Sequence, residues 1–295
     1  MKIDAALHKD LRNVFKTLET QRSQWTQLWL ELSKLYMPKR YSSLYKKGES
    51  NRRASLRNSS ILDSTGTLAS RTLAAGMMNG ITSPVRQWFR LRLAGFEDEL
   101  EHPSRVWLDE VERRMLRVMS ESNFYKALAV AYLELGVFAT SCILIYEDFD
   151  DIIRCYNSPL GEFMLAQSAS QRVDTFARSI EYKLRQMVEK WGEDNLNTNS
   201  KRAWAGEKGG GQLTDHTVHH MVLPAEFDSR LARLSNYPFV ELYWEADSND
   251  GEILGVEGFN EFPGIAPRWD TVGNDVYGST CPGHGCSCRR HPTPA

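Results

Sequence analysis

Apolar residues recur at three- and four-residue spacing over the first part of the chain. The pattern reaches about Tyr36 and consists of Leu11, Phe15, Leu18, Trp25, Leu28, Leu32 and Leu35. Because this is the period of one face of an α-helix, it predicts an amphipathic helix or a pair of helices. Pro38 ends the helical segment, since proline lacks the amide hydrogen that a helix needs.

Three more helices are predicted downstream. Residues 63–65 offer N-cap side chains for a helix to about Asn79, which ends at Gly80 and Pro84. Ser104 starts a second helix, and a turn near residues 122–123 leads into a third that ends at Gly136. The apolar stripe of the helix after Ser104 consists of Trp107, Val111, Met115 and Val118.

The helix that follows residue 63 has one face of small side chains. This face contains Ala69, Gly76 and Gly80. Their side chains are so small that the backbone of another helix can come close. Arg71 interrupts the apolar run, which is too short for a bilayer, so the GxxxG spacing does not predict a membrane helix. We expect the face to pack closely against another helix, within the chain or between subunits.

Strand patterns alternate with these helices. Cys142 to Tyr146 and Ile152 to Tyr156 predict a β-hairpin around an acidic turn, and residues 238–259 predict another around Asn249-Asp250-Gly251. "HTVHHMVLP" (216–224) and "QWFRLRL" (87–93) each alternate as a strand. The fold class is therefore α+β, with long helices and β-hairpins.

Three other segments receive local predictions. "SIEYKLRQMVEKWG" (179–192) predicts a helix closed by its final glycine, and residues 193–212 predict a polar, glycine-rich loop. Trp88 and Phe89 could form a binding platform, but aromatic residues beside a strand are usually core or cover residues, which we favour here.

Charge and composition narrow the class of protein. Lys and Arg number 36 against 38 Asp and Glu among 295 residues, which argues against a protein that coats nucleic acid through net charge. No apolar run is long enough for a bilayer, and the first residues lack the apolar core of a signal peptide. These features predict a soluble, non-exported protein without a membrane contact.

Two groups of residues could in principle hold a metal. One is the acidic turn of residues 147–151, and the other is the set His216, His219 and His220. The turn lacks EF-hand spacing, and neighbouring histidines on a strand point to opposite faces. A metal-dependent hydrolase that uses these groups stays the alternative; we expect no enzyme, no cofactor and no Walker loop.

The chain divides into four predicted segments. These are an N-terminal helical segment (1–38), a basic mobile loop (39–62), a mixed helix and hairpin body (63–278) and a tail rich in Cys, Pro and Gly (279–295). The loop is a solvated linker or a segment that contacts phosphates or a partner. We expect the tail to be disordered, because it lacks apolar periodicity.

Several motifs, in order, resemble the portal, or head-to-tail connecting, protein of short-tailed bacteriophages. The resemblance covers roughly residues 20 to 278. The most specific motifs are the Ala- and Gly-rich helix leading through Thr-Ser-Pro to Trp88-Phe89, the turn at residues 122–125, Pro267-Arg268-Trp269, and Tyr277-Gly278. Several motifs in one order are stronger evidence than any one alone.

This resemblance implies a structural role. Portal subunits form a ring, normally a dodecamer, at one capsid vertex of the virion, and assemble in the host bacterial cytoplasm. Double-stranded DNA passes through the ring without sequence specificity. The implied partners are further copies of the chain, terminase, scaffold and capsid proteins, and tail proteins.

The end of the chain departs from the portal pattern. After Gly278 portal proteins continue into stem, clip and channel-lining parts, whereas this chain reads "STCPGHGCSCRRHPTPA". We therefore expect a C-terminally truncated portal that is not competent to form a full ring. A capsid adaptor that forms no ring stays a further alternative.

Overall fold

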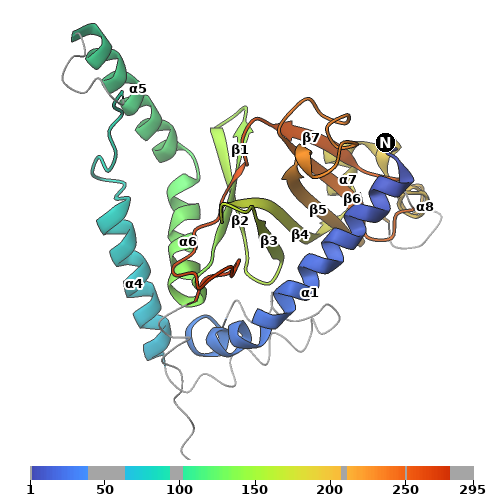
Figure 1. Ribbon diagram of the computed structural model, residues 1–295, viewed down its shortest axis with the longest axis horizontal. Coiled ribbons are helices and arrows are strands. Elements are labelled where there is room, and N and C mark those ends of the chain that lie inside the picture. Colours follow the sequence, from blue (N-terminus) through green and yellow to red (C-terminus); the bar gives the residue numbers. More distant parts are fainter. Residues whose placement is uncertain (1, 39–63, 94–101, 207–210, 250, 280–295) are drawn as a thin grey trace, which may run out of the picture. The chain divides into compact units, whose positions relative to one another are not determined.

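The computed structural model describes residues 2–38, 64–93, 102–206, 211–249 and 251–279 (Figure 1). The predicted basic loop 39–62 and all of the predicted tail except Ser279 lie outside the described residues. The chain forms two compact units. The sheet unit contains residues 1–29, 161–262 and 273–276, and the helical unit contains residues 30–160, 263–272 and 277–295.

The sheet unit is built on five antiparallel strands in the order β3-β4-β5-β6-β7. Their bounds are β3 (Phe163–Gln167), β4 (Val173–Lys183), β5 (Asp215–Pro224), β6 (Phe239–Glu245) and β7 (Gly255–Phe259). Each strand pairs with the next along the chain, as connections of modest length favour. The predicted strand at 216–224 and the hairpin over 238–259 are confirmed.

Helix α1 (Ala5–Tyr36) provides one side of the main core of this unit. The predicted apolar face is confirmed in its first part, because Leu11, Phe15 and Leu18 are buried with Leu7 in one cluster with residues of the sheet, whereas Leu35 near the end of the helix is 53% exposed. The sheet contributes side chains that alternate along its strands, including Met221, Leu223, Val240, Leu242 and Trp244. Of the two predicted alternatives, one helix or a pair of helices, the structure has one long helix.

Two short helices contribute to a second core on the opposite face of the sheet. They are α7 (Leu184–Trp191) and α8 (Thr198–Trp204), and three short 3₁₀ turns lie nearby in sequence at Glu193–Asn195, Gly211–Leu213 and Ala225–Phe227. Leu184, Met187 and Ala203 pack there with Val218 and Tyr243. The prediction of one helix from residue 179 is wrong in its first part, because residues 179–183 belong to β4, whereas Gly192 caps α7 as predicted.

Among its described residues, the helical unit contains the last turns of α1, three further helices and a small sheet. The helices are α4 (Thr65–Ile81), α5 (His102–Glu121) and α6 (Phe124–Phe138), and the sheet has the order β2-β1-β8. Strands β1 (Cys142–Asp148) and β2 (Ile152–Ser158) form the predicted hairpin, and β8 (Gly264–Ile265) pairs with the other edge of β1. Helices α4 and α6 lie side by side (Figure 1).

Three further local predictions for the chain are wrong. Residues 87–93 form no strand, because none of the described strands pairs with this segment and Leu91 instead donates its backbone N–H to the Glu112 carboxyl of α5 at 2.9 Å. Gly136 does not end a helix, since α6 continues to Phe138 and is capped by Ala139 in the left-handed region. The predicted loop after residue 192 contains α8, whose N-cap is Asn197.

Candidate assembly surface

Helix α6 approaches α4 closely at Gly136, which lies beneath Leu73. A Cβ atom at Gly136 would lie 2.9 Å from Leu73 Cδ2, so the absent side chain permits this contact. The same contact continues through the buried Ala74, Tyr132 and Leu135. Thr82 at the end of α4 is hydrogen-bonded to the Tyr132 hydroxyl at 2.9 Å, which fixes α4 on α6.

The small-residue face of α4 does not make this contact. Ala69, Gly76 and Gly80 are exposed, and a Cβ atom built at either glycine meets nothing within 4 Å in the part of the chain that the structure describes. Of the two contacts expected for this face, within the chain or between subunits, the described residues show none within the chain, and the close approach of α4 to α6 lies at Gly136 instead. Leu68 and Ile81 on α4 are 59% and 57% exposed, which leaves this helix with uncovered apolar surface.

Trp88 and Phe89 lie in the extended segment between α4 and α5, and both are half-buried. Their rings meet edge to face at 4.9 Å between centroids. Trp88 packs on a cluster that contains Phe124 of α6 and Ile143 of β1, and its indole N–H donates to the Tyr125 hydroxyl at 3.1 Å. The structure thus places Trp88 as a cover over a small core.

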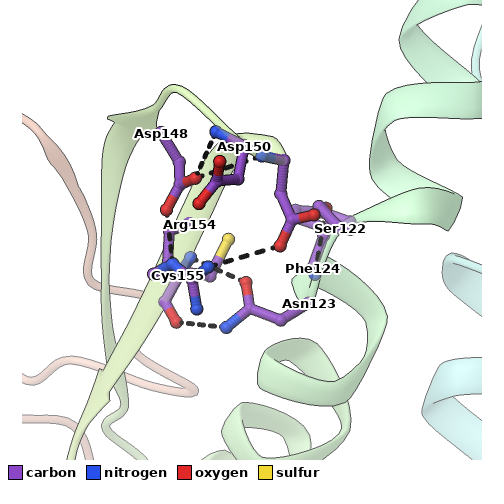
Figure 2. A network of polar contacts seen from close by, with 8 residues as sticks. Ser122, Asn123, Phe124, Asp148, Asp150, Arg154 and Cys155 are labelled. Atoms are coloured by element: carbon purple, nitrogen blue, oxygen red, sulfur yellow. Dashed lines mark hydrogen bonds and ion pairs between the residues drawn. The ribbon is translucent and has the colours of Figure 1, made fainter.

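The acidic turn between β1 and β2 is organised by one carboxylate (Figure 2). The Asp148 carboxylate accepts the backbone N–H groups of Asp150 at 2.9 Å and Asp151 at 3.1 Å, and Arg154 Nε at 2.5 Å. These donors hold the pKa of Asp148 down at about 2, with the Arg154 hydrogen bond as the main cause. The turn therefore satisfies this carboxylate with protein donors.

The outer edge of β2 is tied to α6 by a side-chain amide (Figure 2). Asn123 donates from Nδ2 to the Cys155 carbonyl and accepts the Cys155 N–H at Oδ1, both at 2.8 Å. Asn157 of β2 donates in turn to the Ala127 carbonyl at 2.7 Å. The amide of Asn123 thus pairs with the outer edge of β2 as a neighbouring strand would.

Two motifs of the resemblance meet at the end of α6. Trp269 donates its backbone N–H to the Ala139 carbonyl at 2.8 Å, and Gly278 donates to Thr140 Oγ1 at 2.8 Å. A Cβ atom at Gly278 would lie 2.4 Å from the Ala139 carbonyl oxygen, so a glycine is required there. Tyr277 beside it is only 3% exposed. Two segments distant in sequence from α6 thus close its C-terminal end.

The three candidate histidines all lie on β5, whose neighbouring side chains point to opposite faces of the sheet. His219 packs on Phe15 and Trp244, whereas His220 on the opposite face lies between Arg178 Nε at 2.9 Å and the Glu241 carboxylate at 2.5 Å. Burial lowers the pKa of His220 to about 4 despite Glu241. Among the described residues no three His, Cys, Asp or Glu side chains group as a metal would require.

A Ser-His-Glu cluster, which sequence patterns did not indicate, lies under α8. Ser200 Oγ donates to Glu245 Oε2 at 2.5 Å and lies 3.2 Å from His216 Nδ1, while Asn197 donates its backbone N–H to Glu245 Oε1. Ser200 is fully buried, and both Ser200 and Glu245 approach the same ring nitrogen. A hydrolytic triad places its nucleophile and its acid on different nitrogens. The cluster instead fastens the N-terminus of α8 to β6.

Comparison with known proteins identifies the family to which the chain belongs. The family model described as bacteriophage head to tail connecting protein matches residues 8–287. The chain belongs to this family. The match extends past Gly278, where the motifs of the resemblance end.

Two curated relatives support the head-to-tail connecting family. The chain is 38% identical over 268 residues to the portal protein of Salmonella phage epsilon15, which covers 90% of this chain and 47% of that relative. It is 32% identical over 263 residues to the probable portal protein of Bordetella phage BPP-1, covering 89% of this chain and 46% of the relative. The chain thus spans about half the length of these relatives. No helix among its described residues has the length and apolar content to cross a membrane.

Proposed function

We propose that this chain is a structural subunit of the phage portal ring, at the capsid vertex where head and tail connect. The observation that carries the proposal is the family match over residues 8–287, together with 38% identity to a portal protein. In this role the ring is a conduit for genome packaging and ejection. The chain supplies a passage and docking surfaces, and ATP hydrolysis belongs to a separate terminase.

The surface of the helical unit supports assembly with other copies. Leu68 and Ile81 of α4 and Val106 and Trp107 of α5 are each about half exposed or more, with Trp107 at 64%. Helices that leave large apolar side chains in water are typical of surfaces that a partner covers. The exposed face of Ala69, Gly76 and Gly80 would let a helix of the next subunit come close.

A ring made of identical subunits repeats one contact between two unlike patches. In this proposal the ring is a dodecamer in the virion, built in the host cytoplasm, with terminase, scaffold, capsid and tail proteins as partners. DNA would pass without sequence recognition, in keeping with 36 basic against 38 acidic residues.

Electron microscopy combined with mass photometry of the purified chain tests the proposal. We expect copies to associate into arcs or irregular oligomers as the protein concentration rises, and Gly76→Leu to weaken that association without unfolding the chain. If the wild-type chain stays monomeric at every concentration and Gly76→Leu behaves in the same way, the proposed role as a portal subunit is contradicted. Assays with Mg²⁺, Mn²⁺ and Zn²⁺ for phosphoester hydrolysis test the alternative of a metal-dependent hydrolase.

A further inference from the structure

At the tip of the β1–β2 hairpin an apolar side chain is fully exposed to solvent. Phe149 is 100% exposed, and Ile152 on the same turn is 58% exposed. A fully exposed phenylalanine forgoes the favourable free energy that burial of its ring would contribute. Aromatic side chains of this kind are frequent anchors at protein interfaces.

The turn that carries Phe149 is held in one shape. The Asp148 carboxylate closes it through the N–H groups of Asp150 and Asp151, and Arg154 joins this carboxylate to β2 (Figure 2). Ile152 has φ +69°, a conformation that β-branched residues rarely adopt. Strained, well-braced backbone of this kind gathers where a protein presents a side chain for function. Because the tip is already ordered, little entropy is lost when Phe149 docks.

The hairpin tip is also acidic. Residues 147–154 contain Glu147, Asp148, Asp150 and Asp151 against the single Arg154, which gives a net charge of −3. A partner for this tip therefore has to offer an apolar contact within a positive field.

The extended segment 84–93 of the same helical unit has the complementary properties. It carries Arg86, Arg90 and Arg92 and no acidic residue, a net charge of +3. Val85 is 90% exposed and Leu93 45% exposed, so apolar surface lies among the arginines. The segment is fixed by the hydrogen bonds of Leu91 to Glu112 and of Trp88 to Tyr125.

We propose that the hairpin tip of one copy, residues 147–154, docks on segment 84–93 of a second copy, with Phe149 as the apolar anchor. This proposal rests on the portal function above and names one of its subunit contacts. The tip does not occupy the segment of its own chain, because Phe149 is fully exposed. The two patches are unlike and every copy carries both, which is the requirement for a head-to-tail contact that can close into a ring.

Photo-crosslinking from residue 149 tests this contact directly. The full chain is made with the photoreactive analogue p-benzoylphenylalanine in place of Phe149, irradiated, and the joined peptides are identified by mass spectrometry. Mixing copies labelled with ¹⁵N and ¹⁴N separates links between copies from links within one. We expect links between copies to fall on residues 84–93. Links to another segment, or none between copies, overturn the proposal.

Two classes of variant test its head-to-tail direction. The tip variant combines Phe149→Ala with Asp150→Lys, and the segment variant combines Arg86→Glu with Arg90→Glu. Each alone should weaken self-association about tenfold or more. A mixture should form dimers and stop there, because each such dimer has one intact contact. Matched controls in the sheet unit are Phe227→Ala, also an exposed aromatic, and Glu189→Lys on α7, also an exposed acid. Both should associate like wild type.

The outcomes separate this contact from the portal function. If wild-type oligomers persist in both variants, the subunits assemble through other surfaces, which contradicts the proposed contact and leaves the proposed function intact. If the wild-type chain neither associates nor crosslinks, both the proposed contact and the proposed portal function are contradicted. Circular dichroism of each variant ensures that a loss of association is not a loss of folding.

Discussion

Helices α1 and α5 both follow an apolar helical period, but they differ in what covers them. Along α1, Leu7, Leu11, Phe15 and Leu18 are all at most 6% exposed, because the five-stranded sheet lies against them. Along α5, Trp107 is 64% and Met115 38% exposed, and within the described chain the buried residue is Glu112. Periodicity therefore predicts that a helix forms, whereas the partner of its apolar face comes from tertiary structure or from another subunit.

Truncation of one aromatic residue in each helix tests this contrast most strongly. Phe15→Ala should lower the free energy of unfolding by about 3 to 5 kcal/mol, since the ring packs on His219 and Trp244 and leaves a cavity. Trp107→Ala should change it by only about 0.5 kcal/mol. Urea denaturation followed by tryptophan fluorescence and circular dichroism measures both. Equal losses would show that α5 is covered within the monomer.

The buried carboxyl of α5 gives the next effect. Glu112→Ala removes the acceptor of the Leu91 N–H and should cost about 1 to 3 kcal/mol, because a donor that is partly removed from water loses its partner. Glu112→Gln keeps an oxygen in the same place and serves as the control. Hydrogen exchange at Leu91 reports the bond locally, and unchanged protection in Glu112→Ala would refute its role in fixing segment 84–93.

The two glycine positions of the α4–α6 pair are distinguished by what surrounds them. Gly136→Leu should destabilise the monomer by about 1 to 3 kcal/mol through overpacking against Leu73. Gly76→Leu meets open space and should leave the monomer as stable as before or slightly more stable, since leucine favours a helix over glycine. Thermal melting at low protein concentration compares them. A large loss for Gly76→Leu alone would show that a segment of the same chain packs closely on that face.

These contrasts show how far sequence patterns reach in this chain. The α1 helix, the start of α4 after Ser64, the β1–β2 hairpin and the opposite faces of His219 and His220 follow from local periodicity and turn chemistry, although Ser64 makes no side-chain capping bond. The segment at 87–93 alternates like a strand, but none of the described strands pairs with it and the Glu112 carboxyl accepts the Leu91 N–H. A strand needs a partner, and periodicity in one segment does not supply it.

The small-residue pattern of α4 does not locate the close approach within the chain for a related reason. Gly76 and Gly80 meet no other part of the described chain, whereas the glycine that α4 contacts, Gly136, lies on α6, where the sequence predicts a helix end. In the sequence Gly278 is only part of a motif, and the reason for a glycine there is the Ala139 carbonyl, which lies where its Cβ would be. Which backbone approaches a glycine depends on residues distant in sequence.

The acidic turn provides the last and smallest effect. The pKa of Asp148 lies at about 2 in the folded chain and near 3.8 when its donors are lost, so its contribution to stability is fully present above about pH 4. That contribution disappears as the pH falls towards 2, when the folded carboxylate is protonated. Asp148→Asn removes the charge at every pH, so the difference in melting temperature between wild type and this variant should be largest above about pH 4 and shrink below it. Asp150→Asn is the matched control: its carboxylate adjoins the same turn without accepting these bonds, and its melting temperature should follow wild type with or without calcium. A difference for Asp148→Asn that stays constant from pH 6 to pH 2, or a large rise in melting temperature on addition of calcium, would show that the turn is not held by its own protein donors.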